Sequence, residues 1–133
     1  GLYCSPSFLK MNGAFNNVDQ LDASNVLGLN VSGSPKILLT KGAISHKLPI
    51  KGNRFKVNDS ASIKEAAIAG LGIGFLPKHS ASKAVKNKEL VEIFSDWKID
   101  PVSVYAVYPS REWMPEKLRV FLKYLKEMGK KLQ

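Results

Sequence analysis

The chain has 133 residues, of which 44% are hydrophobic, and a net charge of +9 at pH 7. This length is typical of one domain, and the apolar fraction supplies a modest core, which excludes a wholly disordered chain. The apolar runs are too short to span a bilayer. One cysteine and two histidines exclude an internal disulfide and make a poor metal set. We therefore expect no bound metal, and a reducing cytoplasm fits best.

The first residues predict a strand that leads into a helix. Leu2-Tyr3-Cys4 is apolar, and a chain that starts within a strand favours a fragment of a longer protein over a native edge strand. Cys4 is interpreted as a small buried hydrophobe rather than a reactive thiol. Ser5 and Pro6 are typical of a helix start, and Gly13 is predicted to end this helix.

The next segments are β-like. Residues 25–31 predict a strand, and three further strands are expected at 37–40, 45–50 and 54–57. In the last of these, charged and apolar residues alternate. Because glycine-containing turns separate these last three strands, we expect them to form a meander.

The stretch "AAIAGLGIGFLP" at residues 66–77 is either a glycine-rich phosphate-binding loop or a helix stop followed by a turn. A dinucleotide-binding fingerprint needs a strand, then the glycines, then a helix N-terminus. Here the order is reversed, since Ser62 and Glu65 form a capping-box pattern that predicts a helix ending at Gly70. A strand follows. The glycines are therefore interpreted as a helix stop and a tight turn.

The other end of that helix is a candidate anion site. Asn58, Asp59 and Ser60 lie between a predicted strand and the helix N-terminus, where free backbone N–H groups favour a carboxylate or another anion. In open α/β sheets, ligands lie beyond the carboxyl ends of the strands. Simple capping of the helix by Asp59 or Ser60 explains the same residues, and both readings stay open.

The C-terminal part continues the alternation of helices and strands. Residues 78–94 predict a helix and then a short strand, 95–101 a loop, and 102–109 a clear strand. Pro115 opens a last helix, whose apolar residues follow a helical spacing. Strands that alternate with helices indicate an α/β domain with a mixed sheet.

Five segments in this order resemble the effector-binding domain of LysR-type transcriptional regulators. They are "LYCSPSFLKMNG", "QLDASNVLGLN", "FKVNDSASIKEAAIAGLGIGFLP", "KELVEIFSDW" and "VSVYAVYPSREWMPEKLRVFLKYL". Each motif alone is loose, but the order and spacings agree over nearly the whole chain. One departure is the "KILL" region, which stands where the family frequently has Trp-x-Phe.

The resemblance implies a fold like that of type-2 periplasmic binding proteins, with two α/β lobes joined by two crossing strands and a ligand in the cleft. Residues 1–5 are then the first crossing, and residues 6–98 form the second lobe, a mixed sheet flanked by helices. Residues 99–133 are the second crossing strand and the C-terminal helix of the first lobe. The first half of that lobe and the DNA-binding helix-turn-helix are absent from this chain.

The resemblance also implies the site and the partners. Ser5 matches a hydroxyl position at the first crossing, and Asn58, Asp59 and Ser60 match the second-lobe loop that faces the cleft. These residues are expected to bind a small anionic effector by hydrogen bonds. The expected partners are this effector and further copies of the chain in a dimer or tetramer, with DNA bound only through the absent part. No catalysis, cofactor or membrane contact is expected.

Three other functions compete with this one. The charge of +9 suggests a nucleic-acid-binding module, although the lysines are scattered along the sequence. An enzyme would need a nucleophile motif near His46 or His79, and none is recognisable. A secreted solute-binding protein would share the fold, but the family motifs favour a cytoplasmic regulator.

Overall fold

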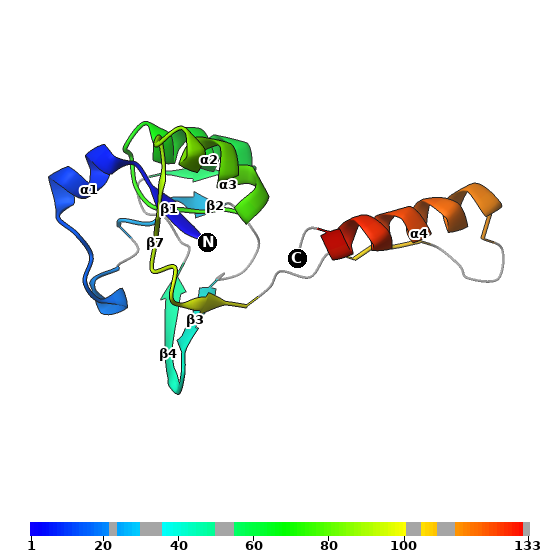
Figure 1. Cartoon of the computed structure of the whole chain (residues 1–133), viewed down its shortest axis with the longest axis horizontal. Coiled ribbons are helices and arrows are strands. Elements are labelled where there is room, and N and C mark those ends of the chain that lie inside the picture. Colours follow the sequence, from blue (N-terminus) through cyan, green and yellow to red (C-terminus); the bar gives the residue numbers. More distant parts are fainter. Residues whose placement is uncertain (22–23, 30–35, 50–54, 101–104, 109–113, 132–133) are drawn as a thin grey trace. The chain divides into compact units, whose positions relative to one another are not determined.

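The computed structural model describes residues 1–21, 24–29, 36–49, 55–100, 105–108 and 114–131. The chain forms two compact units, Gly1–Asp100 and Pro101–Gln133. Figure 1 shows the helices and strands of each. In these ranges no helix is long and apolar enough to cross a membrane.

The N-terminal unit alternates strands and helices, as the sequence predicts. Its elements are β1 (Leu2–Cys4), α1 (Pro6–Asn12), the 3-10 helix η1 (Val18–Gln20), β2 (Gly28–Leu29), β3 (Lys36–Lys41), β4 (Ile44–Pro49), β5 (Lys56–Val57), α2 (Ser60–Ile68), β6 (Gly74–Phe75), α3 (Lys78–Lys86), β7 (Val91–Ile93) and β8 (Lys98–Ile99). The predicted helix that ends at Gly13 and the predicted mixed α/β architecture are confirmed.

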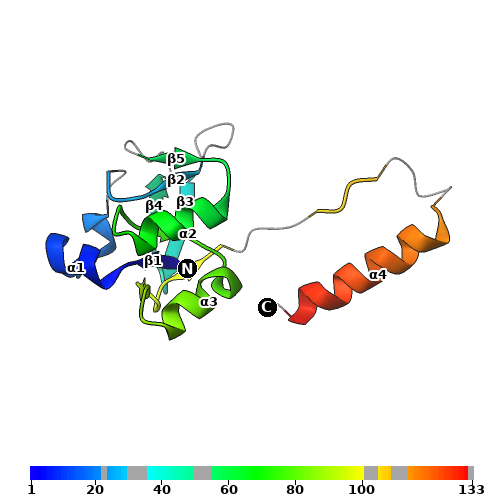
Figure 2. The same ribbon diagram turned by 90° about the horizontal axis from the view of Figure 1, so that it is seen from above.

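The central strands run in two directions. β1 lies between β6 and β7 and is antiparallel to both. β2 and β5 pair in parallel and lie side by side in Figure 2, and a parallel bridge between Val26 and Ile73 joins β2 to the strand that continues as β6. β5, β2 and β6 therefore point the same way and end at one edge, whereas β1 ends at the opposite edge.

Both faces of β1 are buried, and each belongs to a different core. Tyr3 faces a core that α2 and α3 complete with Ile63, Ala66, Ala67, Ala81 and Ala84. Leu2 and Cys4 face the other core, which α1, η1 and the hairpin β3–β4 complete with Phe8, Val18, Ile37, Leu39 and Leu48. Because successive strand residues point to opposite faces, three residues of β1 join the two cores.

The predicted meander is wrong in one strand. β3 and β4 form the expected hairpin, with Leu39 opposite His46, but the third strand of that sheet is β8, from the segment predicted to be a loop. β5 instead pairs with β2, because Phe55 and Val57 pack against the core under α2 and α3. The turn expected at residues 51–53 lies outside the described residues.

Helix α2 ends as the glycine pattern predicts. Gly70 has a φ of +80°, and its N–H donates to Ala67 O at 3.1 Å, while Leu71 N–H donates to Ala66 O at 3.0 Å. These two hydrogen bonds form a Schellman motif, in which a left-handed residue satisfies the last helix carbonyls. The chain then turns directly into β6.

The C-terminal unit contains α4 (Glu116–Lys131), which begins directly after Pro115 as predicted. Glu116 and Arg119 form an ion pair of 3.1 Å on its first turn. Several large apolar side chains of α4 are exposed, namely Val120, Phe121, Tyr124, Leu125 and Met128. An amphipathic helix of this kind normally covers its apolar face with another element.

The strand predicted at residues 102–109 is not formed in its described part, residues 105–108. Tyr105 and Val107 are 81% and 95% exposed, and no described residue pairs with this segment. Alternating apolar residues favour a strand, but a strand needs a neighbour for its backbone hydrogen bonds. The rest of the predicted strand lies outside the described residues.

We predict that Gly70→Ala destabilises the protein, because a left-handed conformation strains any residue with a Cβ by about 1–2 kcal/mol. The free energy of unfolding in urea measures the effect. The matched control is Gly129→Ala, in helix α4 with open space around it, where alanine is expected to be neutral or stabilising. Equal stability of Gly70→Ala and the unchanged chain would contradict the motif.

Candidate functional site

The carboxyl edge of the three parallel strands gathers two helix N-termini. α2 follows β5, and α3 follows β6, so residues 58–60 and 77–79 both lie at this edge, together with the start of β1. Two strand spacings, about 10 Å in all, separate β5 from β6. The carboxyl edge is the part of an open α/β sheet where ligands bind.

Asp59 is the residue that caps α2. Its Oδ1 accepts the backbone N–H of Ser62 at 2.8 Å, and its Oδ2 accepts the Ser62 hydroxyl at 2.8 Å. These hydrogen bonds to Ser62 lower the pKa of the exposed Asp59 carboxyl. Ser62 therefore lies inside the helix, and the capping box predicted for Ser62 and Glu65 is not formed. The carboxylate of Asp59 is committed to the helix rather than free for a ligand.

Asn58 and Ser60 flank this cap and are exposed. Neither side chain has a hydrogen-bond or ionic partner in the part of the chain that the structure describes. An amide and a hydroxyl beside the N-terminus of a nine-residue helix can donate hydrogen bonds to an anion, whereas the backbone N–H of Ser62 is already taken by the Asp59 carboxylate. These two residues form the available part of the predicted site.

Ser5 lies at the opposite edge, so the structure does not bring it to Asn58, Asp59 and Ser60. It is 2% exposed, and its Oγ accepts the N–H of Phe8 at 3.2 Å as the N-cap of α1. A Cβ on Gly70, just beyond the far end of α2, would lie 3.4 Å from this Oγ. The reason is that β1 runs against β6. Ser5 is therefore a capping residue and is left out of the site.

Lys78 and His79 share the carboxyl edge, and sequence reasoning missed them. They form the first turn of α3, both are exposed, and Pro77 gives that helix no side-chain cap. The order of strand, proline and helix was visible in the sequence. What was not visible is that β6 runs parallel to β5, and this direction is what places the two helix starts at one edge.

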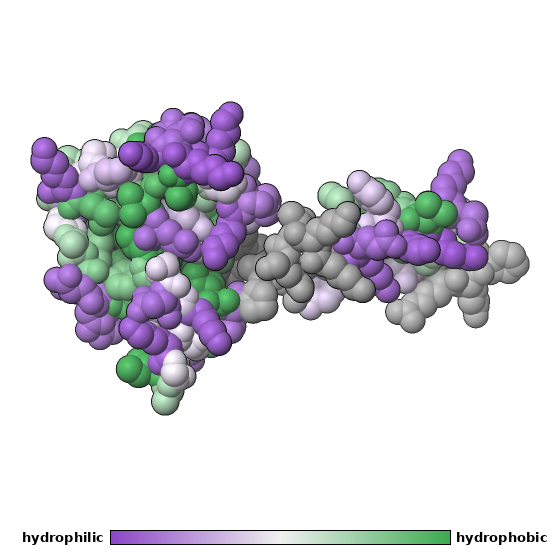
Figure 3. All heavy atoms as spheres, viewed as in Figure 1, coloured by the Kyte–Doolittle hydropathy of each residue, from purple (hydrophilic) through white to green (hydrophobic). Residues whose placement is uncertain are grey.

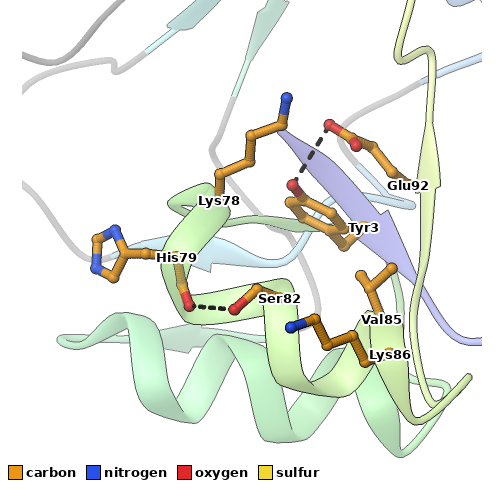
Figure 4. A pocket seen from close by; sticks show the side chains of 7 residues that line it. All are labelled: Tyr3, Lys78, His79, Ser82, Val85, Lys86 and Glu92. Atoms are coloured by element: carbon orange, nitrogen blue, oxygen red, sulfur yellow. Dashed lines mark hydrogen bonds between the residues drawn. The ribbon is translucent and has the colours of Figure 1, made fainter. Parts of the chain in front are cut away.

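A hollow of about 440 Å³ lies beside α3. Figure 4 shows its lining, which comes from β1, α3 and β7: Tyr3, Lys78, His79, Ser82, Val85, Lys86 and Glu92. The Tyr3 hydroxyl donates to Glu92 Oε1 at 3.3 Å. Burial, reinforced by the Glu92 carboxylate, raises the pKa of Tyr3 to about 12.

The cysteine and the histidines do not form a catalytic or metal site. Cys4 is fully buried, and burial raises the pKa of its thiol to about 11, which confirms its interpretation as a small hydrophobe. His46 Nδ1 lies 2.9 Å from Asp19 Oδ1, in a pair that links β4 to η1. No three potential metal ligands gather among the residues that the structure describes.

Two features define the class of this protein: a mixed α/β lobe entered by an antiparallel strand, and polar groups at the carboxyl edge of its parallel strands. Together they are typical of periplasmic-binding-protein-like domains. The model of the LysR substrate binding domain matches residues 2–130, and the chain belongs to this family of regulatory domains of LysR-type transcriptional regulators.

Relatives of known sequence agree with this assignment. The chain is 30% identical over 120 residues to an uncharacterized HTH-type transcriptional regulator of Haemophilus influenzae. This alignment covers 86% of this chain and 40% of that protein. It is 30% identical over 100 residues to the HTH-type transcriptional activator AaeR of Escherichia coli, covering 72% and 32%. The chain spans between about a quarter and two fifths of the length of the curated relatives it matches.

Solved structures show the same fold. The regulatory domain of the C227S variant of AphB from Vibrio vulnificus aligns with a TM-score of 0.73 at 24% identity, over 95% of this chain and 63% of that one. The CrgA regulatory domain from Neisseria meningitidis aligns with a TM-score of 0.67 at 20% identity, over 96% and 62%.

Tyr3→Phe tests the buried phenol. The pKa of Tyr3 is about 12 in the folded protein against 10.0 for an ordinary tyrosine, so the folded state holds this proton more tightly. The raised pKa of Tyr3 therefore contributes to the free energy of unfolding. This contribution is complete below pH 10 and is lost as the pH rises toward 12. We expect the unfolding free energy of the unchanged chain to fall relative to Tyr3→Phe across this window.

The measurement is urea unfolding at a series of pH values, with the exposed tyrosine variant Tyr124→Phe as the control. The Cys4 thiol is common to all three proteins and cancels in the differences. A constant difference between the unchanged chain and Tyr3→Phe from pH 9 to 12 would contradict a raised pKa of Tyr3.

Proposed function

We propose that this chain is the larger part of an effector-binding domain and that its carboxyl edge binds a small organic anion. The observation that carries the proposal is the pair Asn58 and Ser60 at the N-terminus of α2, both exposed and neither bonded through its side chain to any residue that the structure describes. In a LysR substrate-binding domain this edge is a reasonable place for an effector, because the helix N-terminus favours negative charge. Lys78 at the start of α3 adds a positive charge to the same edge.

The proposed domain organisation assigns residues 1–5 to the first crossing strand, 6–98 to the second lobe, and 99–133 to the second crossing and the C-terminal helix of the first lobe. Three observations support it. The first compact unit ends at Asp100, β1 starts at the edge where the effector is proposed to bind, and α4 exposes an apolar face that needs a partner. The remaining length of the relatives can supply that partner.

The proposed mechanism is a shift between two arrangements of the lobes. An effector that contacts both lobes binds the closed arrangement more tightly than the open one and so stabilises it. In a homodimer or homotetramer, this change of arrangement can alter the other subunits. It can also alter the affinity for DNA, which a helix-turn-helix outside this chain would bind. The proposed protein works in the cytoplasm and has no catalytic activity of its own.

A thermal-shift screen of small organic acids tests the site. For an acid that raises the melting temperature, we expect Asn58→Ala and Ser60→Ala each to weaken binding about tenfold or more, because a hydrogen bond to a charged group is lost. Ser45→Ala, which removes an exposed hydroxyl from β4, is the control and should bind normally. Unchanged affinity in both site variants would reject the site.

The gene sequence upstream of Gly1 tests the domain organisation. We expect it to encode about half an α/β lobe preceded by a helix-turn-helix, because the relatives are HTH-type regulators more than twice as long as this chain. Sequencing the locus measures this directly. An unrelated upstream sequence would contradict the proposed regulator and leave the family of the present chain unchanged.

A further inference from the structure

Helix α3 concentrates positive charge on its exposed face. Lys78, Lys83 and Lys86 are exposed, and the helix contains no acidic residue. Ala81 and Ala84, on the opposite face, are buried against the core. Lys83 and Lys86 are three residues apart, so the helical turn brings these two onto one side.

Within the described parts of the chain, the positive charges of this face have no ion-pair partner. The ion pairs of the described residues involve Lys41, His46, Lys64 and Arg119, and none of the α3 lysines. Figure 3 shows hydrophilic side chains gathered at the top of the unit, over α2 and α3. Unpaired like charges on one helix repel each other. An anionic partner that binds there relieves this repulsion, which makes the free energy of binding more favourable.

The hollow beside this helix adds an apolar surface within the basic rim. Val85, 37% exposed, lies on its α3 side, and the Tyr3 ring lies at its base. Glu92, from the edge strand β7, forms the far wall and accepts the Tyr3 hydroxyl. In Figure 4 the Lys78 ammonium and the Glu92 carboxylate lie at one end of the hollow, and Lys86 lies at the other end.

We propose that α3 and this hollow dock an acidic peptide segment of a partner protein, with an aromatic or aliphatic side chain as its anchor. The carboxylates of the segment meet Lys83 and Lys86, and the anchor covers Val85 in the hollow. A protein segment fits better than a nucleic-acid backbone, because phosphates provide no apolar group for the hollow. Glu92 disfavours carboxylates at its own end of the hollow, so the acidic residues are expected beside Lys83 and Lys86.

Fluorescence anisotropy with a labelled heptapeptide of sequence Asp-Glu-Glu-Phe-Glu-Asp-Glu tests the proposal on the full chain. The double variant Lys83→Glu with Lys86→Glu is expected to raise Kd at least about tenfold, since like charges then face each other. The control is Lys47→Glu with Lys98→Glu, on the exposed face of the β3–β4–β8 sheet, which changes the net charge equally. Its Kd should change less than about twofold.

Two further probes separate the proposed partner from others. Replacing the peptide's phenylalanine by serine should weaken binding several-fold, because the hollow no longer buries the ring. A short DNA duplex should compete poorly. Equal weakening by both double variants, indifference to the phenylalanine, tighter α3-dependent binding of the duplex, or no binding of the peptide would each overturn the proposal. None of these outcomes touches Asn58 or Ser60, so the effector site is tested separately.

Discussion

The position of β1 is the constraint on which the rest of this structure depends. It is hydrogen-bonded on both sides, to β6 and β7, and its three residues are all buried, with Tyr3 in one core and Leu2 and Cys4 in the other. A strand held in this way cannot shift by one residue without exchanging the contents of the two cores. Its direction, against the three parallel strands, then decides which loops share an edge.

Because β1 runs against the parallel strands, the N-termini of α1 and α2 lie at opposite edges of the sheet. At the carboxyl edge of the parallel strands, Asp59 caps α2 while Asn58 and Ser60 stay free, so the edge keeps unused hydrogen-bonding capacity. At the opposite edge, Ser5 is buried, and its hydroxyl is hydrogen-bonded to the N–H of Phe8 in the first turn of α1 and to the Ser7 hydroxyl. Similar residue types are thus exposed at one edge and used for local folding at the other.

The positively charged side chains also differ in whether they form ion pairs. Among the described residues, the lysines of α3 are exposed and form no ion pair, whereas Lys41 is paired with Asp96 and Arg119 with Glu116.

The sequence by itself determined the local structure. Ser5 and Pro6 define the start of α1, Gly70 stops α2, and Pro115 precedes α4, because caps, glycine and proline act over a few residues of backbone. The family resemblance followed from the order of such features. It also placed Asn58 in the loop that the structure puts at the carboxyl edge.

Only the tertiary structure decided which segments pair. β5 joins β2 rather than β4, β8 forms where a loop was predicted, and residues 105–108 form no strand. Strand pairing is a contact between distant segments, so alternation of apolar residues predicts a strand without naming its neighbour. For the same reason the sequence placed Ser5 with Asn58, and only the antiparallel direction of β1 showed that they lie at opposite edges.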